Sequence, residues 1–114
     1  LGKFSWAQIP VYLQPGKSSS FHVYLLRIKD ITEAVRDQII QEIFHREVAV
    51  NVHFVPLPMM TFYRESGYDI HDYPVAYDNY SREISLPVYY DLTDAMVDTV
   101  IKAVVDSVKT VTGI

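Results

Sequence analysis

Two consecutive stretches decide the fold: FHVYLLRI at residues 21–28 and ITEAVRDQIIQEIF at residues 31–44. The first is dense in β-branched, aromatic and aliphatic side chains and too short for a typical helix, so it predicts a buried strand. The second has apolar residues at helical spacing on one face and polar residues such as Arg36 on the other, so it predicts an amphipathic helix on a core. Asp30 and Glu33 have the spacing of a capping box, which predicts Asp30 as the N-cap of this helix.

The alternation of strand and helix continues downstream. Residues 48–55 have a period of two, which predicts a second strand with Asn51 and His53 on one face and Phe54 on the other. Two prolines end this strand, and residues 59–66 predict a short helix closed by a glycine.

The C-terminal part predicts a further helix, strand and helix. A short helix is expected from Pro74 to Ile84, and a short third strand over 85–90. A proline within that strand predicts that it lies at a sheet edge. Thr93 is placed to cap a long amphipathic helix that ends at Gly113.

This order of elements predicts a small α/β (α+β) sandwich, with helices packed on a sheet of about three strands. The sheet is expected to be antiparallel or mixed, because a helix that crosses a sheet end can return in either direction. Residues 1–20 predict an extended lead-in, and residues 21–114 predict the domain itself. Because the chain opens at Leu1 rather than at Met, we expect a piece of a longer protein with a further domain on its N-terminal side.

Composition narrows the function classes. The length of 114 residues suits one domain, and a net charge of −4 gives no positive field that would attract nucleic acid or an anionic membrane. The absence of cysteine excludes disulfides, thiolate metal sites and cysteine nucleophiles, and suits a reducing compartment, so we expect the cytoplasm. The common nucleotide, zinc and serine-hydrolase motifs are absent, so the residues predict no catalytic and no metal site.

His53 and Asn51 are the candidate binding residues, because they share the non-core face of the second predicted strand just before a proline bend. A solvated strand face is the alternative for both. Three further histidines have structural interpretations: His22 inside the first strand, His45 at a helix C-terminus and His71 in a solvated turn.

Five tyrosines cluster between two prolines: Tyr63, Tyr68, Tyr73, Tyr77 and Tyr80. Rings at this density cover the edge of a small core or line a groove or an interface. The core or edge interpretation is the one that we expect.

Four segments, taken in order, resemble the small C-terminal domain of the DegT/DnrJ/EryC1/StrS sugar aminotransferases. They are FHVYLLRI (21–28), VNVHFVPL (50–57), Phe62-Tyr63 and ISLPVYYDLTD (84–94). The resemblance covers roughly residues 8–110. It implies the fold of the small domain of fold-type I pyridoxal phosphate enzymes.

The resemblance also implies a function for the parent protein. Members of the family use pyridoxal phosphate to move an amino group, usually from glutamate, onto a nucleotide-linked keto-sugar, as in polysaccharide biosynthesis, and they are usually dimers. The residues that hold the cofactor belong to their large N-terminal domain, so the resemblance implies no catalytic or cofactor-binding residue here and no activity of this piece alone. The implied partners are that large domain, the sugar substrate and a second subunit.

In this family the small domain forms a wall of the substrate cleft, where a His-Tyr pair is followed by Pro-x-His. His53 matches the first histidine, and we expect it and Asn51 to bind substrate. The tyrosine and the second histidine are replaced by Phe54 and Pro58, which removes a phenol and an imidazole that could bind a sugar or its phosphates.

Two other functions stay open at this point. A free-standing interaction or ligand-binding module would use the tyrosine-rich segment 63–80 to contact a partner. A regulatory relative would keep the family's architecture without transamination.

Overall fold

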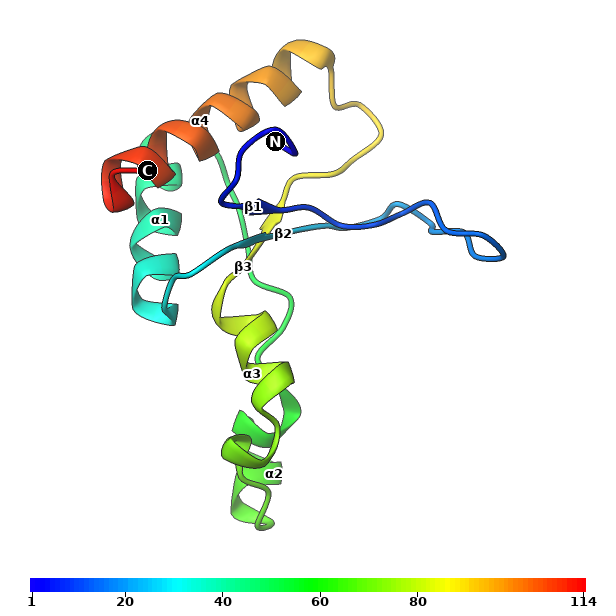
Figure 1. The fold of residues 1–114 in the computed structure, drawn as a ribbon, viewed down its shortest axis with the longest axis vertical. Helices are drawn as coiled ribbons and strands as arrows, with labels where there is room; N and C mark the ends of the chain where they lie inside the picture. Colours follow the sequence, from blue (N-terminus) through cyan, green and yellow to red (C-terminus); the bar gives the residue numbers. More distant parts are fainter.

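The sheet has three strands, and both neighbouring pairs are antiparallel. The computed structural model describes all 114 residues (Figure 1). β2 (Tyr24–Ile28) lies between β1 (Ala7–Gln8) and β3 (Glu83–Leu86), with Arg27 opposite Glu83. The antiparallel alternative is therefore correct, and β3 lies at a sheet edge as the proline predicted.

Four α-helices accompany the sheet, and this α/β architecture confirms the predicted fold class. They are α1 (Glu33–His45), α2 (Thr61–Glu65), α3 (Pro74–Ser81) and α4 (Asp94–Thr112), with short 3-10 turns at Leu57–Met59 and Ile70–Asp72. The third strand is thus Glu83–Leu86 rather than 85–90, because the chain leaves α3 at Ser81 and Pro87 has no N–H to extend the pairing.

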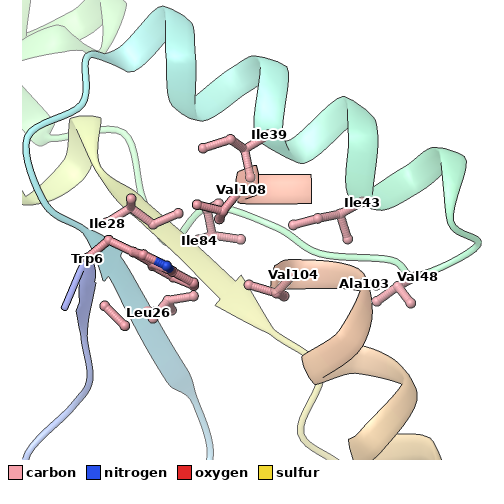
Figure 2. Close-up of a cluster of buried hydrophobic side chains, with 11 residues drawn as sticks. Trp6, Leu26, Ile28, Ile39, Ile43, Val48, Ile84, Ala103, Val104 and Val108 are labelled. Carbon is pink, nitrogen blue, oxygen red and sulfur yellow. The ribbon is translucent and has the colours of Figure 1, made fainter. Parts of the chain in front are cut away.

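The hydrophobic core lies between the sheet and the helices α1 and α4 (Figure 2). Leu26 and Ile28 from β2, Ile84 from β3 and Ile39 from α1 are fully buried, and α4 adds Val104. Each buried side chain of this size stabilises the fold by roughly 1.5–3 kcal/mol. β3 is therefore anchored to the core through Ile84.

Both long helices begin at a threonine cap. Thr93 Oγ1 accepts the amide hydrogen of Met96 at 3.2 Å, and Gly113 ends α4 in the left-handed region with φ of 78°, as predicted. For α1 the predicted capping box is wrong. Asp30 lies in a left-handed turn with φ of 59°, and Thr32 caps the helix instead.

The N-terminal segment contributes more to the core than an extended lead-in requires. Trp6 and Ala7 are buried, and the Trp6 ring lies over the core beside Leu26 (Figure 2). β1 pairs with the outer edge of β2, with Ala7 opposite Ile28.

Residues 48–55 do not form the predicted second strand. Asn51 makes a single antiparallel bridge with Ser85, and no regular pairing continues beyond it. Two contacts explain this. The Val48 N–H bonds to the Ile43 carbonyl at the end of α1, and the His53 N–H bonds to the Glu83 side chain rather than to a strand carbonyl.

Arg36 is buried, whereas the helical pattern placed it on the solvent face of α1. Its Nη1 donates to the carbonyl oxygens of Tyr80 at 2.6 Å and Glu83 at 3.2 Å, and its guanidinium stacks on the Tyr80 ring at 4.9 Å from the centroid. The cation is thus buried because it satisfies two backbone carbonyls where α3 meets β3. Arg36 ties α1 to the strand that carries Glu83.

Glu33 makes a second connection between α1 and α3. Its two carboxylate oxygens accept the phenol hydrogens of Tyr77 at 2.9 Å and Tyr80 at 2.8 Å. The hydrogen bond to Glu33 raises the pKa of Tyr77, and burial followed by the hydrogen bond to Glu33 raises the pKa of Tyr80. The folded state therefore favours both neutral phenols.

This arrangement predicts a loss of stability at high pH. A phenol whose pKa is raised on folding stabilises the native state below its unfolded value of 10.0, and the contribution disappears as the pH rises through the raised value. Glu33→Gln should reduce this alkaline decrease in the free energy of unfolding, measured by urea denaturation on either side of pH 10. The matched control Glu65→Gln, at an exposed glutamate of α2, should keep the wild-type decrease. Equal decreases in Glu33→Gln and wild type would contradict the assignment.

Two parts of the chain project from the core. Residues 9–23 run out and back as an arm, and residues 54–80 form a helical lobe that carries α2 and α3 (Figure 1). The Cα radius of gyration is 15.4 Å, above the roughly 13 Å of a compact chain of this length.

The tyrosines of the lobe do not cover the core edge. Tyr63, Tyr68, Tyr73 and Tyr77 are exposed, so the core interpretation is wrong for four of the five rings.

Candidate functional site

An open groove of about 430 Å³ brings the two predicted binding residues together. Asn51 and His53 line it from the 48–55 segment, and Ser85 lies between that segment and β2. The complete lining is His22, Val23, Ala49, Val50, Asn51, His53, Ser85, Leu86, Pro87 and Val88. The groove is therefore formed where the chain crosses the outer edge of the sheet.

His53 is held by two side chains of β3. Its Nδ1 lies 2.7 Å from Ser85 Oγ, and its backbone N–H donates to Glu83 Oε2 at 3.0 Å. Ser85 Oγ in turn donates to Glu83 Oε1 at 2.5 Å. The imidazole is half-buried and meets the Phe54 ring edge-on, with ring centroids 4.7 Å apart. No hydrogen bond engages Nε2, so that nitrogen is the free polar atom of the ring.

Asn51 is fixed through its backbone. Its N–H bonds to the Ser85 carbonyl at 3.1 Å, and its carbonyl accepts the Ser85 N–H at 2.7 Å. The side-chain oxygen accepts the Val52 N–H at 2.8 Å. The exposed amide nitrogen therefore remains as a donor beside the groove.

Glu83 and Ser85 are the residues that sequence reasoning missed. Both are buried, at 4% exposure each, in a strand that was expected to begin only at Ser85. The available signal was the i, i+2 spacing of Glu83 and Ser85 around Ile84, just before the apolar run 86–88. Two buried polar side chains on one face of a strand indicate a polar partner, which here is His53.

The other histidines differ in their surroundings. His22 is exposed and lies outside β2, with Nδ1 2.9 Å from Ser20 Oγ, so its placement inside the strand is wrong. His45 ends α1, as predicted. His71 lies in an exposed turn, also as predicted, and pairs with Asp69 at 2.7 Å. The hydrogen bonds from the backbone and ring of His71 lower the pKa of Asp69.

The chain contains no group of three or more residues that could hold a metal ion. Among its helices, none combines the length and the apolar character that crossing a bilayer demands.

The lysines of this chain do not fit a site for covalently bound pyridoxal phosphate. Such a site needs a desolvated lysine together with a partner for the pyridinium nitrogen. All five lysines are exposed, and Lys102 pairs with Asp106 at 2.5 Å on the surface of α4. The residues of this chain therefore offer no attachment point for the cofactor.

Comparison with known proteins finds one family model and several longer relatives that match most of this chain. The model of the DegT/DnrJ/EryC1/StrS aminotransferase family matches residues 5–105. The uncharacterized protein MJ1066 of Methanocaldococcus jannaschii is 40% identical over 87 residues, which are 75% of this chain and 22% of that protein. The spore coat polysaccharide biosynthesis protein SpsC of Bacillus subtilis is 32% identical over 112 residues, which are 92% of this chain and 29% of SpsC.

A solved structure supports the same relationship. Spr1654 from Streptococcus pneumoniae, a proposed sugar aminotransferase, superposes in its pyridoxal phosphate form with a TM-score of 0.90 and 34% identity. The match covers 94% of this chain and 27% of Spr1654. The chain thus spans between a fifth and a third of the length of the proteins that it matches.

Proposed function

The chain belongs to the DegT/DnrJ/EryC1/StrS aminotransferase family, and from this premise we propose that it is the small C-terminal domain of a pyridoxal phosphate-dependent sugar aminotransferase. The reaction that we propose for the complete protein transfers an amino group from glutamate to a nucleotide-linked keto-sugar. The cofactor supplies the electron sink for that chemistry. The part assigned to this chain is one wall of the sugar site.

The observation that carries this proposal is the His53 ring held at the groove by Ser85 and Glu83. A sugar is recognised through directional hydrogen bonds to its hydroxyls, and these need polar groups in fixed positions. His53 Nε2 offers one such group and the Asn51 amide another, and both residues line one groove. The two side chains are suited to bind the sugar and to orient it.

The cofactor, by contrast, would be held by the rest of the protein. The exposed lysines of this chain provide no attachment point, so we expect residues 1–114 alone to be inactive. A direct consequence is that chemistry and sugar binding are divided between two domains.

Two exposed apolar surfaces support a large domain as the partner. The arm exposes Val11 at 71% and Leu13 at 84%, and the lobe exposes Phe54 at 72% and Phe62 at 73%. Large apolar side chains exposed to this extent are suited to an interface. We propose that the protein's own N-terminal domain covers the lobe, and that a second subunit completes a homodimer. A reducing compartment such as the cytoplasm suits a chain without cysteine.

The test is an amino-transfer assay on the complete protein that contains this chain. Protein, pyridoxal phosphate and glutamate are incubated with a panel of nucleotide-linked keto-sugars, and the products are identified by mass spectrometry. We expect formation of a nucleotide-linked amino-sugar that depends on the cofactor and on glutamate. Sugar binding without amino transfer across the panel would favour the regulatory relative instead, and absence of both would overturn the proposal.

A further inference from the structure

We propose that Glu83 and Ser85 are positioning residues that hold neutral His53 in the Nδ1–H tautomer, so that Nε2 is an acceptor for a substrate hydroxyl. The use of Nε2 toward a sugar rests on the proposed function. The tautomer itself follows from the hydrogen-bond network of this chain.

The direction of the network is set by the one donor whose hydrogen cannot move. The backbone N–H of His53 always donates, so Glu83 Oε2, 3.0 Å away, must accept. The other carboxylate oxygen, Glu83 Oε1, accepts the hydroxyl hydrogen of Ser85 at 2.5 Å.

The remaining bond is fixed by counting hydrogens. A serine hydroxyl has one hydrogen, and Ser85 gives it to Glu83. Toward His53 the Ser85 oxygen can therefore only accept, so His53 Nδ1, 2.7 Å away, must carry the proton. A neutral imidazole has one N–H, which leaves Nε2 unprotonated.

Burial and backbone pairing keep the network rigid. Glu83 and Ser85 are each only 4% exposed, so few solvent donors compete for their oxygen atoms. The Ser85 backbone is paired with Asn51 in both directions, and the Glu83 carbonyl accepts from Arg36 at 3.2 Å. Both side chains thus project from a fixed strand toward His53.

The tautomer has a consequence for recognition. With neutral His53, an unprotonated Nε2 accepts a hydrogen bond from a hydroxyl, whereas it cannot donate one to a carbonyl or phosphate oxygen. In the proposed reaction, His53 would therefore select a sugar hydroxyl rather than the keto group or the diphosphate.

The test uses NMR of the protein that contains this chain, labelled with ¹⁵N in its histidine rings. The ¹⁵N shifts and their couplings to ring hydrogens distinguish a protonated from an unprotonated nitrogen at a pH where the ring is neutral. His53→Gln assigns the signals by removing one set. In the wild-type protein we expect Nδ1 at the protonated position and Nε2 at the unprotonated position.

Two variants test whether Glu83 and Ser85 set the tautomer of His53. In Glu83→Gln the amide oxygen still accepts from the His53 N–H, so the NH₂ group donates to Ser85 Oγ, and the Ser85 hydroxyl then donates to an unprotonated Nδ1. The tautomer is then expected to reverse to Nε2–H. In Ser85→Ala the acceptor is gone, and His53 should return to the Nε2–H preference of a free imidazole. The signals of His45 and His71, which contact neither residue, should stay unchanged.

The outcomes decide the proposal. An Nε2–H tautomer in the wild-type protein would overturn it, as would Nδ1–H retained in both variants; where Glu83→Gln does not fold, Ser85→Ala decides alone. Because the NMR measurement needs no substrate, it is independent of the amino-transfer assay. Amino transfer without the expected tautomer overturns only this inference, and the expected tautomer without amino transfer overturns only the proposed function.

Discussion

Arg36→Ala is expected to lower the free energy of unfolding by about 2–5 kcal/mol. The substitution leaves the carbonyl oxygens of Tyr80 and Glu83 without their buried donor, at a cost of about 1–3 kcal/mol each. It also removes the guanidinium that packs on the Tyr80 ring. The effect is large because one side chain joins α1, α3 and β3.

The measurement is urea denaturation of the wild-type and variant proteins. Arg36→Met separates the two causes, because it restores an apolar stem of similar length without hydrogen-bond donors. Arg36→Met should therefore recover only part of the free energy of unfolding that Arg36→Ala loses. The control is Arg64→Ala, at an exposed arginine of α2, which should change stability by no more than about 0.5 kcal/mol. A loss below about 1 kcal/mol in Arg36→Ala would show that the two carbonyls find other donors.

The second large effect is expected on kcat/KM for the keto-sugar when His53 is replaced. His53→Gln in the complete protein should lower kcat/KM for the sugar roughly 5- to 150-fold, because removing the imidazole acceptor leaves a bound sugar hydroxyl unpaired, at a cost of about 1–3 kcal/mol. Glutamine keeps a polar group of similar length but cannot reproduce a ring held against Ser85 and edge-on to Phe54.

The matched control is His45→Gln. His45 ends α1 and is exposed, and its nearest charged partner is Glu42 rather than any groove residue. It should keep the wild-type kcat/KM. If both variants keep full activity, His53 does not bind the sugar, and the groove is not the sugar site.

The parts of the fold that sequence predicted well are those decided by local patterns. The apolar run that contains β2 and the apolar stripe of α4 identify their own elements. Thr93 and Gly113 also mark the two ends of α4, because each lies directly beside the helix terminus that it caps. These signals do not depend on the rest of the chain.

The errors arose where a tertiary contact overrode the local pattern. Arg36 occupies a polar position of the α1 pattern, yet two carbonyls from a segment more than forty residues away bury it. The 48–55 alternation is typical of a strand, but the Glu83 side chain takes the His53 N–H that a ladder would need. Neither contact leaves a mark in the local sequence.

The candidate site was predicted in part. The strand period and the proline bend pointed to His53 and Asn51, the resemblance to the family supported His53, and the structure places both residues at one groove. The network behind His53 could not be foreseen, because Glu83 and Ser85 come within reach of the ring only when β3 passes beside residues 51–53. Whether the two residues bind substrate stays a prediction.

The most direct test is a crystal structure of the complete protein with pyridoxal phosphate and the nucleotide-linked amino-sugar product. We predict that the sugar lies in the groove, with one of its hydroxyls within hydrogen-bond distance of His53 Nε2. We also predict that the cofactor is held by residues outside this chain. A product bound away from His53 and Asn51, with the groove covered by protein, would contradict it.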